Sequence, residues 1–159
     1  MRNVDRLLGE YGESHQNALN ETIHWVCVPA IFFSIVGLIS CIPPGPMLTL
    51  EPWLGNCANW ALPALVVLAI YYVILSPSLA VGMVLFSAGC LALAGFISAH
   101  SPVPLWAVCT GVFGISWVFQ FLGHQVEGKK PSFLKDLQFL LIGPAWLMHF
   151  IYQKVGVSY

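Results

Sequence analysis

Long apolar runs separated by short polar stretches dominate this chain. Four runs contain no Lys, Arg, Asp or Glu, and they cover residues 23–42, 58–75, 79–99 and 104–123. Each approaches the length of a bilayer-spanning helix, which is about 20 apolar residues. Hydrophobic residues make up 58% of the 159 positions and charged residues only 8%. The pattern predicts an all-α, polytopic membrane bundle of four transmembrane helices, folded as a single integral-membrane domain over residues 1–159.

Proline, glycine and serine mark the boundaries between these runs. Residues 41–55 contain four prolines, and we expect an extended loop there. Shorter breaks at 76–78 and 101–104 predict tight turns.

Basic residues occur only before the first run and after the fourth. They are Arg2, Arg6, Lys129, Lys130, Lys135 and Lys154. Because cytoplasmic segments are enriched in Lys and Arg, we expect both termini in the cytoplasm and an even number of spans between them. The formal net charge of -1 gives no reason to expect nucleic acid as a partner.

The last apolar segment, residues 133–152, is ambiguous. It carries Lys135 and Asp136 near its start, and a Gly143-Pro144 step interrupts it. As a fifth span it would place Lys154 on the opposite side from the other basic residues, whereas a broken, interfacial or re-entrant hairpin keeps them together. We predict the broken C-terminal hydrophobic hairpin, with a fifth segment as the alternative.

The expected topology sorts the five histidines. His15, His24 and His124 all fall at the cytoplasmic ends of the first and fourth spans, so they can converge. His100 falls on the far side of a hydrocarbon core about 30 Å thick. His149 can reach the other three only if the last segment folds back.

Polar residues near these histidines follow helical spacing. Asn17, Asn20 and His24 stand at i, i+3 and i+7, and Gln120, His124 and Glu127 stand at i, i+4 and i+7. Each set therefore lies on one helix face. A helix that begins near Asn17, with Asn17 as its cap, leaves His15 free to turn toward the other two histidines.

Three imidazoles at a membrane edge suit a divalent transition metal, Fe(II) or Zn(II), with carboxylate or amide groups around them. A purely structural interpretation stays open as well. Membrane histidines often form hydrogen bonds between helices, asparagines often serve only as caps, and Glu127 can be a solvated residue beside Lys129.

Two of these patterns resemble signatures of a known family. Residues 15–24 have the form His-x-Asn-x-x-Asn-x-x-x-His and lead into an apolar helix with Pro29. Residues 117–124, Trp-Val-Phe-Gln-Phe-Leu-Gly-His, are followed by Glu127. In this order they are similar to the first two signatures of the membrane 2-hydroxy fatty acid dioxygenases, named for the metabolism of phytosphingosine to odd-numbered fatty acids. The Gly143-Pro144 step resembles a third signature, and the resemblance spans nearly the whole chain.

The resemblance implies an Fe(II)-dependent oxidoreductase of fatty acid alpha-oxidation. It would use O2 to convert a long-chain 2-hydroxy fatty acid to the acid one carbon shorter. The expected metal ligands are His15, His24 and His124. Fe(II) held by three neutral imidazoles keeps open positions for chelation by the hydroxyl and carboxylate of the substrate. No 2-oxoglutarate is required, because the substrate supplies the electrons, and its acyl tail stays in the lipid bilayer.

Other site residues follow from the helical spacing given above. We expect Glu127 to take part in catalysis, and Asn17, Asn20 and Gln120 to support the ligands. The acidic residue of the family falls one position later than Glu127, and the family often has a glutamate near the position of His149. The exact roles of Glu127 and His149 therefore stay open.

Two other functions remain as alternatives. Three histidines and a water molecule also describe a catalytic zinc site, which would suit a zinc-dependent membrane lipid amide hydrolase. The second alternative is a non-enzymatic membrane scaffold whose histidines join helices.

A bacterial inner membrane is the favoured location, or the ER membrane if the protein is eukaryotic.

Overall fold

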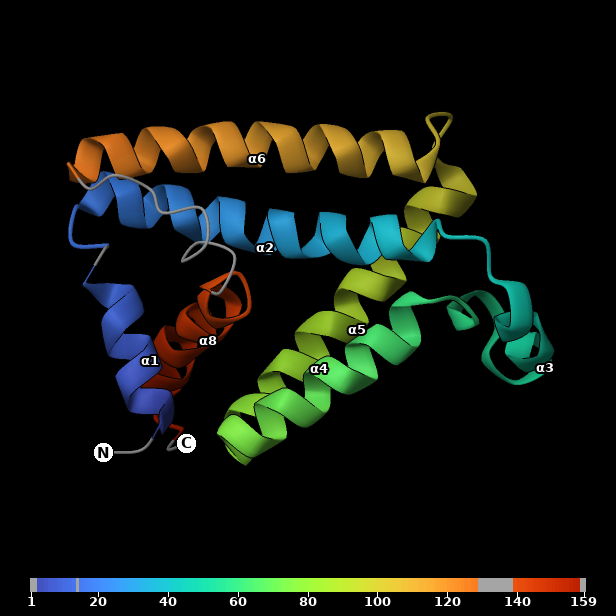
Figure 1. Ribbon diagram of the computed structural model, residues 1–159, viewed down its shortest axis with the longest axis horizontal. Coiled ribbons are helices and arrows are strands. Elements are labelled where there is room, and N and C mark those ends of the chain that lie inside the picture. The colour runs from blue at the N-terminus through green and yellow to red at the C-terminus, as the bar shows by residue number, and fades with distance from the viewer. Residues whose placement is uncertain (1–2, 14, 129–138, 158–159) are drawn as a thin grey trace.

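The computed structural model describes residues 3–13, 15–128 and 139–157, and all regular secondary structure in them is helical (Figure 1). The long helices are α2 (Ala18–Ser40), α5 (Pro77–His100) and α6 (Leu105–Glu127). Shorter ones are α1 (Asn3–Gly12), α4 (Ala61–Leu75) and α8 (Ile142–Val155). The all-α prediction is confirmed for this part of the chain.

Helices α2 and α6 lie side by side in opposite directions along almost their whole lengths (Figure 1). Small residues allow this close approach. A Cβ atom on Gly37 would collide with the thiol of Cys109, and one on Gly123 would collide with the side-chain oxygen of Asn20. The two glycines stand near opposite ends of the interface, so the helices are close together at both ends.

Helices α4 and α5 form a hairpin that crosses α2 obliquely (Figure 1). Ser76 makes the turn between them, and its hydroxyl accepts a hydrogen bond from the Leu79 N–H at the start of α5. Pro77 occupies the first turn of α5, where its missing N–H costs nothing. The tight turn expected at 76–78 is therefore present.

Helix α1 packs on α8 through one apolar face. That face consists of Val4, Leu8 and Tyr11, whose spacing of four and three residues matches the helical repeat. Gly143 of α8 lies against the hydroxyl of Tyr11 and against Val28 of α2. The two ends of the described chain are thus on the same side of the molecule (Figure 1).

Three of the four predicted spans, α2, α5 and α6, are long and apolar enough to cross a membrane. The fourth, α4, is apolar but has only 15 residues, or about 22 Å of helix against a hydrocarbon core of about 30 Å. It begins at Ala61 rather than at residue 58, because the side chain of Asn59 accepts the Ala61 N–H and forms a turn there.

The expectation of an extended loop over residues 41–55 is wrong. The structure has a 3-10 helix, η1 (Gly45–Leu50), then α3 (Glu51–Leu54) and a second 3-10 helix, η2 (Gly55–Cys57). Both η1 and α3 carry proline in the first turn. Proline fixes a backbone angle that suits the start of a helix, so these prolines begin helices here instead of preventing them.

The ambiguous C-terminal segment is described only in part, since residues 133–138 lie outside the described ranges. The described portion contains α8, whose 14 residues do not make it a candidate span. Gly143 and Pro144 lie in its first turn, where proline is tolerated, so they do not break it. Helix α8 contacts α1, α2 and α5.

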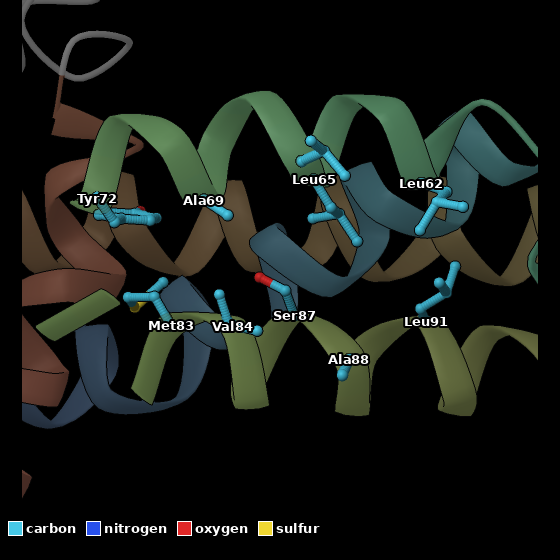
Figure 2. A pocket seen from close by; sticks show the side chains of 10 residues that line it. Leu62, Leu65, Ala69, Tyr72, Met83, Val84, Ser87, Ala88 and Leu91 are labelled. Atoms are coloured by element: carbon cyan, nitrogen blue, oxygen red, sulfur yellow. The ribbon is translucent and has the colours of Figure 1, made fainter. Parts of the chain in front are cut away.

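An apolar cavity of about 190 Å³ lies between α4 and α5 (Figure 2). Tyr72 and Met83 are among its lining residues, all of which belong to these two helices. Tyr72 also donates its hydroxyl proton to the carbonyl oxygen of Leu141 at 2.6 Å, which ties α4 to the start of α8.

Candidate metal centre

His15, His24 and His124 meet at one end of the α2–α6 pair. One ligand atom from each lies within 4.8 Å of those from the other two, and all three side chains are buried. The ring centroids of His15 and His24 are 4.2 Å apart, those of His24 and His124 are 5.0 Å apart, and those of His15 and His124 are 5.6 Å apart. The structure thus brings together the three histidines that the charge pattern placed on one side.

Backbone carbonyls orient two of the rings. Nδ1 of His15 lies 2.7 Å from the carbonyl oxygen of Tyr11, and Nδ1 of His24 lies 2.9 Å from that of Asn20. A carbonyl oxygen only accepts, so Nδ1 carries the proton in each ring. Nε2 then keeps its lone pair, which is the arrangement found in metal-binding histidines.

Aromatic side chains enclose His15. Its ring stacks on Tyr11, with centroids 4.2 Å apart and planes 12° apart. The ring centroid of Trp146 on α8 lies 5.5 Å from that of His15 and 5.2 Å from that of Tyr11. Helices α1 and α8 therefore form an apolar wall beside the histidine cluster and keep water from that side.

Glu127, at the end of α6, faces the start of α2. Its carboxylate accepts hydrogen bonds from the backbone N–H groups of Gln16 and Asn17 and from the side-chain amide of Asn20. Asn17 is the N-cap of α2, and its side chain accepts the Leu19 N–H. Glu127, Asn17 and Asn20 are thus joined by hydrogen bonds at the start of α2, next in the chain to His15 and one turn before His24.

The other candidate residues are Gln120 on α6, His100 on α5 and His149 on α8. Gln120 stands one turn before His124 on α6 and is half-buried. His100 is exposed at the end of α5, where it stacks on Phe96. His149 is half-buried on α8 and packs against Phe150; burial lowers its pKa, and the Asp5 carboxylate acts in the opposite direction. Neither His100 nor His149 belongs to the three-histidine group.

The donor set fits a divalent transition metal. Nitrogen ligands lie about 2 Å from such an ion and therefore at most about 4 Å from one another, so three atoms that lie within 4.8 Å of one another need only a small approach to share one ion. Imidazole is a common ligand of both Fe(II) and Zn(II), so the donor set fits either ion. Burial also favours a ligand role. Burying a polar nitrogen costs free energy unless it has a partner, and one shared cation would be a partner for all three imidazoles.

Sequence reasoning missed Tyr11 and Trp146. The spacing of Val4, Leu8 and Tyr11 was a usable signal, because it marks a short amphipathic helix directly before His15. Trp146 lay in the ambiguous C-terminal segment, and no local pattern connected it with a histidine more than a hundred positions earlier.

Fold and site together define an all-helical protein with membrane-length helices and a buried three-histidine cluster. Residues 1–155 match the family model described as 2-hydroxy-palmitic acid dioxygenase Mpo1-like, so the chain belongs to the Mpo1-like family. It is similar to the 2-hydroxy-palmitic acid dioxygenase MPO1 of Saccharomyces cerevisiae, with 29% identity over 153 residues that cover 94% of this chain and 79% of that protein. No solved structure matches the chain.

Proposed function

We propose that this protein is an Fe(II)-dependent dioxygenase that shortens a long-chain 2-hydroxy fatty acid by one carbon. His15, His24 and His124 would hold the iron. The observation that carries the proposal is the convergence of these three buried side chains in a chain of the Mpo1-like family.

The overall reaction balances without a second reductant. A 2-hydroxy acid and O2 have the atoms of the acid one carbon shorter, CO2 and water. The four electrons that reduce O2 come from carbons 1 and 2 of the substrate as the bond between them breaks. Bound iron would supply the redox chemistry with O2 and the positions at which the substrate hydroxyl and carboxylate chelate.

The protein side chains have three tasks in this reaction. The three histidines bring their ligand nitrogen atoms close together. In His15 and His24 the Nδ1 proton is held by a backbone carbonyl, which leaves Nε2 neutral and free to bind a metal. Tyr11 and Trp146 exclude water from one side. The membrane-length helices α2 and α6 keep the cluster beside lipid, so a long acyl chain can remain in apolar surroundings while its polar end reaches the histidines.

We further propose four membrane crossings, with α4 as the short one and both chain ends in the cytoplasm. Support comes from the positions of the basic residues and from the packing of α1 on α8. In right-side-out vesicles, a membrane-impermeant maleimide should label the exposed Cys41 at the far end of α2. It should not label Gln16→Cys in a chain lacking Cys41 and Cys57. Labelling of the residue 16 thiol would reject this topology.

Product analysis tests the reaction. Purified anaerobically, loaded with Fe(II) and supplied with O2, the protein should convert 2-hydroxypalmitic acid to pentadecanoic acid without 2-oxoglutarate. Palmitic acid should react poorly, because it lacks the hydroxyl needed for chelation. An unchanged hydroxy acid with iron fully loaded would reject the dioxygenase, and cleavage of a ceramide with zinc bound would support the amide hydrolase instead.

A further inference from the structure

Glu127 joins two parts of the chain that are 110 residues apart. Its Oε1 accepts the Gln16 N–H at 2.9 Å, and its Oε2 accepts the Asn17 N–H at 2.9 Å. Oε2 also accepts from Nδ2 of Asn20 at 3.0 Å. Both carboxylate oxygens are therefore bound to the segment that begins α2. Hydrogen bonds to an ionised acceptor are stronger than those between neutral groups, so these three bonds hold the end of α6 to the start of α2.

These contacts take the place of a capping box, a local motif that stabilises the first turn of many helices. In a capping box, a glutamate at the third helical position accepts the N–H of the N-cap residue. The N-cap of α2 is Asn17, and the third position is Asn20, which has no carboxylate. Glu127 supplies that carboxylate from α6, and the amide of Asn20 turns toward it. The start of α2 thus depends on the end of α6.

All three histidines adjoin these contacts. His15 directly precedes Gln16, whose N–H Glu127 binds. The backbone oxygen of Asn20 is the partner of Nδ1 of His24. On α6, His124 lies one turn before Glu127, and its neighbour Gly123 leaves the space that the Asn20 side chain fills. A single carboxylate therefore links the segments that carry the three rings.

We propose that Glu127 is a positioning residue that holds His15 and His24 in register with His124. This differs from a direct catalytic role, and it rests on the metal site proposed above. The carboxylate is not among the three groups whose ligand atoms lie within 4.8 Å of one another. Its oxygens instead face backbone and amide donors.

Co(II) titration of the full chain in detergent micelles tests this role, with Glu127→Gln compared to the wild type. Glutamine has the same shape but is neutral, and its NH2 group would face a backbone N–H that needs an acceptor. We expect the Kd for Co(II) to rise about 10- to 100-fold. The visible absorption of bound Co(II) should also change, because it depends on ligand geometry. A residue needed only for global stability would alter the melting temperature without altering this spectrum.

Glu10→Gln is the matched control. Glu10 lies on the exposed surface of α1 and pairs only with Arg6 at 3.3 Å among the contacts described for it. Its substitution removes the same charge from the same end of the protein, and we expect the Kd and the Co(II) spectrum to stay unchanged.

Glu127→Asp covers the case in which the glutamine variant does not fold. Aspartate keeps the charge but is one methylene shorter, so it cannot reach all three donors, and we expect an intermediate rise in Kd. An unchanged Kd and spectrum in a folded variant would overturn the proposal. Normal Co(II) affinity with lost turnover would overturn it too, since that result indicates a direct part in the reaction. A wild-type protein that binds Co(II) but does not shorten the hydroxy acid would reject the proposed reaction alone.

Discussion

His15 and His100 make the same local contacts in different surroundings. In each, Nδ1 faces the carbonyl oxygen four residues earlier, at 2.7 Å for His15 and 3.0 Å for His100. Each ring also stacks on the aromatic ring of that earlier residue, with centroids 4.2 Å and 4.4 Å apart. Only His15 is buried beside two other histidines. Convergence of helices, and not the local motif, distinguishes the candidate metal centre.

Removal of any one of the three clustered imidazoles should release the metal. We expect His24→Ala and His124→Ala to lower the iron content of the purified protein at least about tenfold, because two nitrogen ligands hold an ion far less tightly than three. His100→Ala should retain the wild-type content. Plasma mass spectrometry of anaerobically prepared protein measures this, and equal iron in all four proteins would mean that the cluster is not the binding site.

Tyr11 should matter for metal affinity although it is not one of the three clustered histidines. Tyr11→Leu removes the ring on which His15 stacks, so His15 gains freedom and loses orientation. We expect the Kd for Co(II) to rise about tenfold. Phe96→Leu removes the equivalent ring beneath the exposed His100 and should leave the Kd unchanged. A similar Kd for Tyr11→Leu and the wild type would show that stacking does not position His15.

Gly123→Ala should separate α2 from α6 at the histidine end. The added methyl would collide with the side chain of Asn20, which must then move away from Glu127. Overpacking of this kind costs about 1–3 kcal/mol of unfolding free energy, and Co(II) affinity should fall with it. At Gly114, also on α6, an added Cβ meets nothing within 4 Å, so Gly114→Ala serves as the control. Equal stability and affinity in both variants would contradict the close packing at Gly123.

Tyr72→Phe tests the connection between α4 and α8. The hydroxyl of the buried Tyr72 donates to the carbonyl oxygen of the exposed Leu141 at 2.6 Å, and the substitution removes this hydrogen bond. We expect the free energy of unfolding to fall by about 0.5–1.5 kcal/mol, measured by reversible SDS titration in mixed micelles. Tyr71 is half-buried and packs edge-on against Tyr72, so Tyr71→Phe is the neighbouring control and should change stability little. A loss of equal size in the two variants would argue against a specific role for the Leu141 contact.

The sequence predicted the helical class and the grouping of His15, His24 and His124, because both depend on signals that act along a whole segment. Apolar runs of membrane length indicate helices wherever they occur. The one-sided distribution of basic residues indicates which segment ends lie together. Neither inference needs the exact start of a helix or the partner of a particular side chain.

The remaining features depend on single contacts, either within a turn or between residues far apart in the sequence. Helix α4 is shortened by the side chain of Asn59, and a window of hydropathy does not detect one hydrogen bond. The acceptor for the Asn17 N–H comes from α6 rather than from the third position of α2, so no local capping pattern in the sequence indicates it. Trp146 reaches His15 only through the packing of α8 on α1.

The order of the three clustered histidines along the chain has a consequence for biosynthesis. His15, just before α2, and His24, within α2, leave the ribosome early, whereas His124 follows 100 residues after His24 and Trp146 later still. During synthesis the first two imidazoles are therefore present without their third companion while two further helices are inserted. A metal ion that arrived at that stage would find only two of the three imidazoles, so binding by all three would have to follow the docking of α6 on α2. Chains that end before α6 would lack the complete cluster.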